Sequence, residues 1–405
     1  VIKSGATLNV SDTSSVNMTD GNITKNATVN LTDRGVFNMS GGTFNDGATL
    51  NIDDQGEFNI SDGIFDSDAT MVISEQGKVN QSGGTVRLDK NDTFAGDYNL
   101  SGGSLDLKGV TKKESGEFKQ TGGNTLITGE TFDLNNSADK ISGGSLTIGT
   151  ADDPSSLTLS KGSVGSDVTT NLVKDSTIYV KGGKLALDSG DTVNGNIKIS
   201  KGNVSLDAVT KGKFGTFTQT DGTTTITGKG FDLNNEDDII SGGLVRVGGE
   251  VADSELNISE GTISSSAVVK VDNGSSVNLN GGKVTSGATV SLKDTSKFNM
   301  SKGEISDKAH LTFNNSSQMN MSNGDITNGA ILDFNDSSQM TMTDGTIDKN
   351  SVLNFKDESG FTMSSGEITE NAQVNLEDKA KMKMTDGEIS SGATITLKDK
   401  SDFQM

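Results

Sequence analysis

The sequence contains no cysteine, no tryptophan, one proline and one histidine among its 405 residues. Without cysteine, the chain cannot form disulfide bonds or thiolate metal sites, and this composition fits a secreted bacterial surface protein. The one histidine, His310, takes the place of an outward Thr289 one repeat earlier, so we expect it to be exposed and inert. A catalytic triad and a zinc site are therefore not expected.

Apolar and aromatic residues are also scarce, at 31% and 4% of the chain, and the formal net charge is −21. Such a composition normally indicates disorder, unless the fold uses its few apolar residues economically. Excess acidic charge argues against a nucleic-acid partner, because phosphate contacts require clustered Lys and Arg. No apolar run approaches the ~20 residues that span a bilayer, so we expect no membrane insertion of this segment.

What the sequence does contain is a repeat marked by glycine. Within two runs, successive marks are 21 residues apart. We expect each mark to be a turn that needs a positive φ or a close backbone approach. The marks are Gly21, Gly42, Gly63 and Gly84, then Gly282, Gly303, Gly324, Gly345, Gly366 and Gly387.

Between these runs the spacing varies, and a longer unit is duplicated. The segment Phe132–Asn136 reappears as Phe231–Asn235, 99 residues later. We therefore expect one continuous solenoid over 1–405. Its sub-regions are regular coils over 1–84, a first 99-residue unit over 85–183, a second over 184–282, and regular coils over 283–405.

Within each repeat, apolar residues alternate with polar ones, as in strands with one buried face. Phe37 and Met39 point inward in one strand, and Ala48, Leu50 and Ile52 point inward in another. The pattern predicts an all-β parallel β-helix (β-solenoid) with about 21 residues per triangular three-strand coil and about 19–20 coils. Short connections between parallel strands favour a right-handed winding. At a strand spacing of ~4.8 Å, the rod would be on the order of 90 Å long.

Several outward columns could carry chemistry. Asparagines recur one coil apart, which predicts amide ladders. Many of them also form Asn-x-Ser/Thr tripeptides, although a repeat with Asn outside and Ser at the turn generates these automatically. The columns are Asn17, Asn38, Asn59 and Asn80, and Asn9, Asn30 and Asn51.

Acidic residues recur at a second turn. Carboxylates ~5 Å apart repel one another, and Ca²⁺ is a natural counterion, although nearby lysines could neutralise the column instead. No other cofactor is implied. The candidate calcium column is Asp12, Asp33, Asp54, Glu75, Asp294, Asp336, Asp357, Asp378 and Asp399.

Five polar residues fall at inward positions. Gln81, Gln120 and Gln219 take the place of Met or Leu, so their amides are expected to bond one another or the backbone. Asp139 and Asp238 are equivalent in the two 99-residue units. We expect a local loop to turn both carboxylates outward rather than bury them.

The phrases Met39-Ser40-Gly41-Gly42-Thr43-Phe44 and Met342-Thr343-Asp344-Gly345-Thr346-Ile347 resemble the Ser-Gly-Gly-Thr-type repeats of bacterial surface proteins and autotransporter-like adhesin passengers. The resemblance implies a secreted, extracellular or cell-surface β-helical stalk or fibre, with adhesion as its role. Because Val1 opens in mid-pattern, the chain is expected to be a piece of something longer.

Three functions follow from these observations. The first is a structural, adhesive stalk or fibre segment whose partners are further copies, adjoining repeats stacked end to end, or host or surface glycans. The alternative is a glycan- or ice-binding module that uses the column Thr7, Thr28, Thr49 and Thr70. The second alternative is a β-helical polysaccharide-cleaving enzyme. Because β-helical enzymes build clefts from long loops and the turns here are regular, we expect no enzyme.

Overall fold

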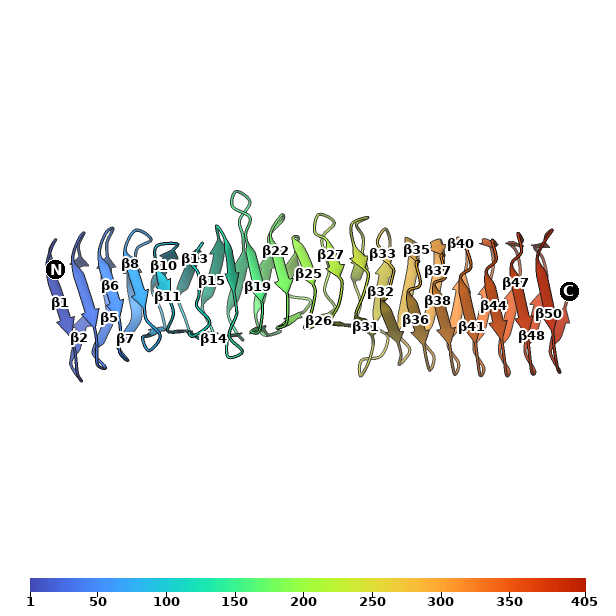
Figure 1. The fold of residues 1–405 in the computed structure, drawn as a ribbon, viewed down its shortest axis with the longest axis horizontal. Coiled ribbons are helices and arrows are strands. Elements are labelled where there is room, and N and C mark those ends of the chain that lie inside the picture. Colours follow the sequence, from blue (N-terminus) through green and yellow to red (C-terminus); the bar gives the residue numbers. More distant parts are fainter. The chain divides into compact units, whose positions relative to one another are not determined.

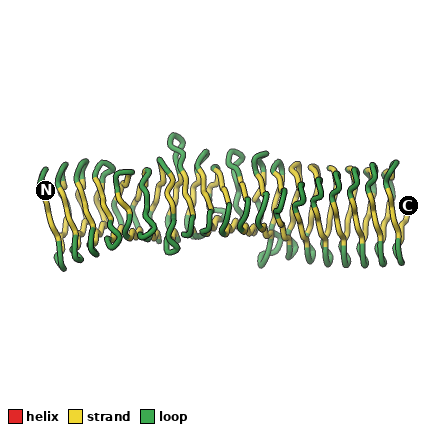
Figure 2. Tube along the Cα trace, viewed as in Figure 1, coloured by secondary structure: helices red, strands yellow, loops and turns green.

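The computed structural model describes residues 1–405 and groups them into two compact units, Val1–Ile197 (the N-terminal unit) and Lys198–Met405 (the C-terminal unit). The chain is an all-β parallel β-solenoid with about 19 coils of about 21 residues, which confirms the predicted fold class. Strands one coil apart lie side by side within each unit, and only strands and loops are present (Figures 1 and 2). No helix could cross a lipid bilayer. A single continuous solenoid stays a prediction.

In the N-terminal unit, the strands of each face pair in parallel with their equivalents one coil away. One face contains β1 (Thr7–Val10), β4 (Thr28–Leu31), β6 (Thr49–Ile52), β8 (Thr70–Ile73) and β11 (Thr93–Phe94), with a further ladder of β16 (Thr131–Asp133), β19 (Ser156–Leu159) and β22 (Thr177–Val180). The next contains β2 (Ser15–Met18), β5 (Val36–Phe44), β7 (Glu57–Phe65), β9 (Lys78–Gln81), β12 (Asp97–Leu100), β14 (Phe118–Gln120), β17 (Lys140–Ile141), β20 (Ser163–Val164) and β23 (Lys184–Leu187). The third contains β3 (Asn22–Ile23), the ends of β5 and β7, β10 (Thr85–Asp89), β13 (Ser104–Lys108), β15 (Asn124–Thr128), β18 (Ser145–Ile148), β21 (Thr169–Leu172) and β24 (Thr192–Val193).

The C-terminal unit follows the same plan, and β25 (Asn196–Ile199) lies where the chain passes from one unit to the other. One face contains β26 (Asn203–Asp207), β28 (Thr223–Thr227), β31 (Leu244–Val247), β34 (Val268–Val271), β36 (Thr289–Leu292), β38 (His310–Phe313), β41 (Ile331–Phe334), β44 (Val352–Phe355), β47 (Gln373–Leu376) and β50 (Thr394–Leu397). The next contains β29 (Phe231–Leu233), β32 (Glu255–Ile258), β35 (Ser276–Val284), β37 (Lys297–Ile305), β39 (Gln318–Met321), β42 (Gln339–Met342), β45 (Gly360–Met363), β48 (Lys381–Met384) and β51 (Asp402–Gln404). The third contains β27 (Phe217–Gln219), β30 (Ile239–Ile240), β33 (Thr262–Ile263), the ends of β35 and β37, β40 (Asp325–Ile326), β43 (Thr346–Ile347), β46 (Glu367–Ile368) and β49 (Glu388–Ile389).

Alternation along each strand decides which side chains form the core. In β5 the side chains of Phe37 and Met39 are buried, while Asn38 between them reaches the surface. Phe37 lies opposite Phe58 of the next coil, and Leu50 of β6 lies opposite Met71 of β8. The inward and outward assignments made from the sequence are thus confirmed for these strands.

Glycine stands at the marked corner for the two reasons expected. All the marked glycines except Gly282 have a positive φ, for example 90° at Gly42. A Cβ on Gly42 would lie 2.4 Å from the carbonyl oxygen of Gly21 one coil earlier. At Gly282 only the close backbone approach requires glycine, since a Cβ there would lie 2.3 Å from the Gly261 oxygen. The corner therefore excludes any larger residue.

The core is built from side chains that stack on their own equivalents. Phe313, Phe334 and Phe355 lie one above another, with ring centroids 4.4 and 4.6 Å apart and nearly parallel planes. Met319 and Met340 are buried in the same unit, as core filler. Because each ring is covered by both neighbouring coils, few apolar residues per coil suffice to exclude water.

Replacing Phe334 with Ala should lower the free energy of unfolding by about 3–5 kcal/mol, because the cavity opens between two rings that cannot close over it. Chemical denaturation of the full chain, followed by circular dichroism, measures the change. The exposed Lys356→Ala, one strand away, is the control and should shift stability by less than about 0.5 kcal/mol. Equal effects of the two substitutions would contradict a close-packed stack.

Candidate functional site

Asparagine ladders run along the outer surface, as the sequence predicted. In the N-terminal unit, Asn38 Nδ2 donates to Asn17 Oδ1 at 2.8 Å, and Asn59 Nδ2 donates to Asn38 Oδ1 at 2.9 Å. A second column repeats the arrangement, with Asn30 donating to Asn9 at 2.7 Å and Asn51 donating to Asn30 at 2.8 Å. These amides join neighbouring coils and so have a structural role.

The residues of the acidic column suit the backbone conformation of the turn in which they lie. All of its members except Glu75 have a positive φ, a conformation that Asp and Asn tolerate better than most residues. In the C-terminal unit each carboxylate also accepts an N–H from the preceding coil. Asp357 accepts from the N–H of Asp336 at 3.1 Å, and Asp378 accepts from that of Asp357 at 3.3 Å.

Calcium binding at this column stays a prediction. No group of three or more His, Cys, Asp or Glu side chains is arranged to hold a metal ion. Two of the neighbouring lysines pair with glutamates outside the column, Lys379 with Glu358 at 2.9 Å and Lys398 with Glu377 at 2.7 Å. Repulsion along the column is therefore offset mainly by backbone N–H donors rather than by these lysines.

The threonine column is regular in the N-terminal unit alone. Thr7 lies opposite Thr28, and Thr49 lies opposite Thr70. In the C-terminal unit the equivalent outward positions read differently from coil to coil, and the register is Thr289, His310, Ile331, Val352 and Gln373. A flat hydroxyl face of the kind expected for ice binding thus covers only a few coils.

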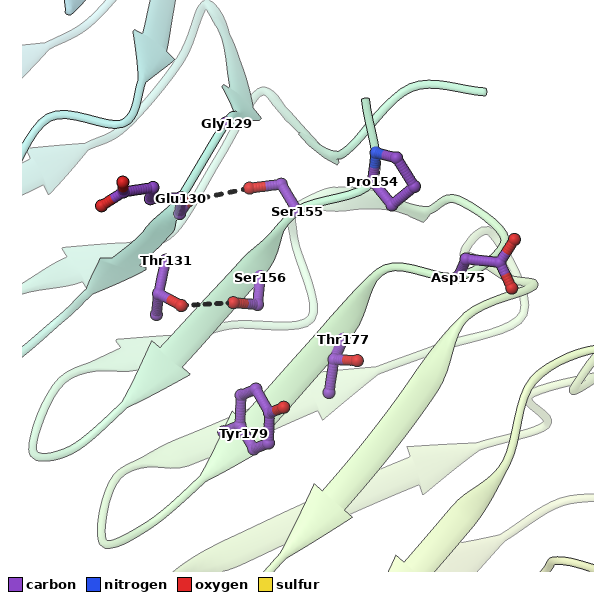
Figure 3. A pocket seen from close by; sticks show the side chains of 9 residues that line it. All are labelled: Gly129, Glu130, Thr131, Pro154, Ser155, Ser156, Asp175, Thr177 and Tyr179. Carbon is purple, nitrogen blue, oxygen red and sulfur yellow. Dashed lines mark hydrogen bonds between the residues drawn. The ribbon is translucent and has the colours of Figure 1, made fainter. Parts of the chain in front are cut away.

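An open depression of about 470 Å³ lies beside the irregular loop that contains Pro154 (Figure 3). The Ser155 hydroxyl donates to the Glu130 carbonyl at 2.9 Å, and the Thr131 and Ser156 hydroxyls are 2.6 Å apart. The lining is Gly129, Glu130, Thr131, Pro154, Ser155, Ser156, Asp175, Thr177 and Tyr179.

The depression does not bring together a pair of carboxylates for acid and base catalysis. Its two acidic side chains, Glu130 and Asp175, stand at opposite ends and point away from each other (Figure 3). Hydrolysis of a glycosidic bond requires two carboxyl groups that face one bond from opposite sides. This geometry does not support the polysaccharide-cleaving alternative.

The three inward glutamines are buried and bonded, as expected. Gln120 Nε2 donates to the carbonyls of Gly143 and Ser145, each at 3.0 Å, while its Oε1 accepts from Thr125 at 2.7 Å. Gln81 and Gln219 make similar bonds to the backbone and to a hydroxyl. The amides serve the backbone rather than one another.

The expectation for Asp139 and Asp238 was wrong, since both carboxylates are fully buried. Each lies 3.0 Å from a buried ammonium group, that of Lys112 for Asp139 and that of Lys211 for Asp238, and all four side chains are 0% exposed. The Lys112 ammonium also donates to the Gly116 carbonyl at 2.6 Å. A buried ion pair persists only when its remaining donors and acceptors are satisfied, and here they are.

These aspartates belong to a set of four that sequence reasoning only half found. Asp92 accepts the N–H of Met71 at 2.6 Å and that of Asp89 at 2.5 Å. Asp191, Asp139 and Asp238 make the equivalent two bonds, one to the preceding coil and one three residues back. The sequence contained one signal for these four residues. Each is a carboxyl residue at an inward position, three residues after another polar turn residue.

Burial is the main influence on the titration of these groups. It raises the pKa of Asp92 from 3.8 to about 7, although the N–H donors of Met71 and Asp89 oppose the shift. Burial also raises the pKa of Asp139, Asp191 and Asp238. Lys112 and Lys211 lower the pKa of their partners Asp139 and Asp238, but less than burial raises it.

His310 is partly exposed, and its Nε2 lies 2.7 Å from Asp333 Oδ2, in the next strand of the same face. That it is inert stays a prediction. Asp333 is two positions beyond Ile331, the direct cross-strand neighbour of His310 in register. The contact is therefore diagonal, which a comparison of equivalent positions does not reveal.

Comparisons with known proteins do not assign a family. No family model and no curated protein matches the chain. A crystal structure described as a TibC-catalyzed hyper-glycosylated TibA55-350 fragment is similar, with 14% sequence identity, 98% of this chain and 94% of that chain covered, and a TM-score of 0.22. At that TM-score we infer nothing about this chain from the likeness.

Replacing Lys211 with Met should destabilise the protein by about 3–5 kcal/mol, because Asp238 is left as a buried, unpaired charge. The double variant Lys211→Met/Asp238→Leu should recover part of the loss, since both charges are then gone while the N–H groups of Phe217 and Asn235 lose their acceptor. Chemical denaturation of both variants and the parent gives the comparison. If the double variant were no more stable than the single one, a buried unpaired charge at Asp238 would not be the cause of the loss.

The Asp92 carboxyl should make stability depend on pH. Because its pKa is higher in the folded chain, its contribution is full below pH 3.8 and is lost as the pH rises through about 7. Within that window it should decline by about 1.4 kcal/mol per pH unit. Asp92→Asn should remove this slope, and the exposed Asp68→Asn should keep it. A carboxyl that NMR shows ionising near pH 4 would mean that the two N–H donors outweigh burial.

Proposed function

We propose that this chain is a structural, adhesive β-solenoid, a stalk or fibre segment of a bacterial cell-surface adhesin or self-assembling appendage. The observation that carries the proposal is the in-register stacking of near-identical coils within each unit, such as Phe313, Phe334 and Phe355. Such stacking gives stiffness along the coil axis without a large core. The proposed location of the chain is extracellular, on the bacterial cell surface.

The outer surface supports the same proposal. Amide ladders such as that of Asn278, Asn299 and Asn320, with bonds of 2.8 and 2.9 Å, cover the strands with uncharged polar groups bonded to each other. Because these amides bond to each other, the strand faces present few unsatisfied donors or acceptors. The depression beside Pro154 presents no acid and base pair, so a non-catalytic role accounts for the geometry best.

The proposed partners are other copies of the chain or adjoining repeats of the same kind. Parallel ladders can be extended by another strand of matching pattern, because main-chain bonds supply affinity and the alternating side chains supply register. Each coil here presents such a pattern to the next, as with Leu332 opposite Leu353 and Phe334 opposite Phe355. End-to-end stacking would continue the same core.

Negative-stain electron microscopy of the purified chain should show filaments many times longer than one molecule. The filaments should survive a Ca²⁺ chelator, because backbone N–H groups already occupy the acidic column. Loss of filaments on chelation would assign that column to Ca²⁺, and the pair Asp336→Asn/Asp357→Asn would then reproduce the loss. Short isolated particles in both conditions would contradict self-assembly.

The cellular side of the proposal has its own test. Antibodies against the chain should label intact cells of the source bacterium, and protease added outside the cells should remove the label. Labelling that requires permeabilised cells would contradict a surface location, whatever the microscopy shows.

A further inference from the structure

Three basic side chains gather on one face of the C-terminal unit. Arg246 of β31 lies directly opposite Lys270 of β34, and Lys293 follows the last residue of β36, the next strand. All three side chains are exposed. Together with Val271, Asp272 and Ser291 they line a pocket of about 240 Å³, which we call the basic pocket.

The arrangement is unfavourable on its own. Like charges directly opposite one another in a sheet destabilise it. Some other lysines of this unit have carboxylate partners, as Lys229 has Glu255 at 3.1 Å and Lys283 has Glu304 at 3.2 Å. No ion pair of the structure involves the side chains that line the basic pocket, in a chain whose net charge is −21.

The internal duplication supplies a comparison within the chain. The residues 99 positions before Arg246, Lys270 and Lys293 are Thr147, Asn171 and Asn194. Thr147 lies opposite Asn171 in the N-terminal unit, as Arg246 lies opposite Lys270. The coil therefore does not require charge at these positions. Arg246 and Lys270 lie in the second 99-residue unit and Lys293 lies in the coil that follows it, so these coils differ from those 99 residues earlier in three basic residues that line a single pocket.

The other lining groups indicate what kind of anion fits. Asp272 Oδ1 accepts the N–H of Gly249 at 2.7 Å, which holds the carboxylate at the edge of the basic pocket. Asp272 and the Ser291 hydroxyl can accept hydrogen bonds, and the basic groups can only donate. A ligand that carries both a negative charge and hydroxyl donors would use all of these groups.

We propose that the basic pocket binds an acidic sugar, a saccharide ring that bears a carboxylate or sulfate together with free hydroxyls. Arg246 takes the anionic group through its guanidinium, in the fork geometry that matches a carboxylate. Lys270 and Lys293 add charge, while Asp272 and Ser291 accept from ring hydroxyls. The basic pocket goes beyond the proposed stalk function, since either can hold without the other.

Nucleic acid and anionic lipid suit the pocket less well. Both carry charge over a long stretch or a wide surface, so binding them requires basic groups spread over many coils. Here the basic groups occupy neighbouring strands of one unit, and the acidic column of Asp294, Asp336 and Asp357 lies on the same unit. A single charged ring is the ligand that matches this extent.

The test uses the full chain and the triple variant Arg246→Thr/Lys270→Asn/Lys293→Asn, which introduces the residues found 99 positions earlier. Isothermal titration measures binding of oligogalacturonate, chondroitin sulfate oligosaccharides and neutral dextran oligosaccharides. The parent should bind at least one acidic series and not dextran, and the variant should bind it at least about tenfold more weakly. Circular dichroism and thermal melting confirm that the variant is folded.

A charge-matched control keeps the result specific. Lys297→Thr/Lys302→Asn/Lys308→Asn removes three exposed charges of the same unit outside the basic pocket and should leave affinity within about twofold. An equal loss in the control would overturn the proposal, because binding would then follow net charge. The proposal would also be overturned if inorganic sulfate, at the same concentration as the acidic oligosaccharide, displaced it from the chain. Tighter binding to single-stranded DNA or to phosphatidylserine vesicles would overturn it as well.

Discussion

The parallel ladder that sets each residue against its equivalent one coil away is the constraint on which the rest of the structure depends. Because of this register, a side chain that is repeated at one position of every coil forms a column of like side chains. Columns of like residues suit apolar groups and amides, because rings stack and an amide is both donor and acceptor. The phenylalanine stack at Phe313 and Phe334 and the ladder at Asn17 and Asn38 are the two results. For charged groups the same ladder is a liability, since like charges are brought ~5 Å apart.

The acidic column and the buried aspartates show two ways in which the chain manages that liability. At Asp336 and Asp357 the carboxylates stay in water and accept N–H groups from the neighbouring coil. At Asp139 and Asp238 the carboxyl group is taken inside, where two N–H donors and one ammonium group satisfy it. In both cases the backbone N–H groups stabilise the charge, because every coil offers them at the same place.

Periodicity made the fold predictable from the sequence, and it also explains what could not be predicted. Phe37, Met39 and Asn38 lie where alternation placed them, because the neighbours of each are copies of itself. The pairing of Lys112 with Asp139 joins positions that are not equivalent, 27 residues apart, in coils that depart from the regular length. The bond from His310 to Asp333 is diagonal for the same reason. A repeat shows which residues stack in one column, but it does not show which residues of different columns contact each other.

Departures from the column rule are consequently the places where function is most visible. Arg246, Lys270 and Lys293 depart from this arrangement, since they bring like charges together and none of them forms an ion pair with a carboxylate. The coils 99 residues earlier show that Thr147, Asn171 and Asn194 satisfy the fold at these positions without charge. A structural requirement for charge would apply to both sets of coils. Stability within the coil gives no reason for three adjacent positive charges, whereas a bound anionic group, as proposed above, would supply a counter-charge.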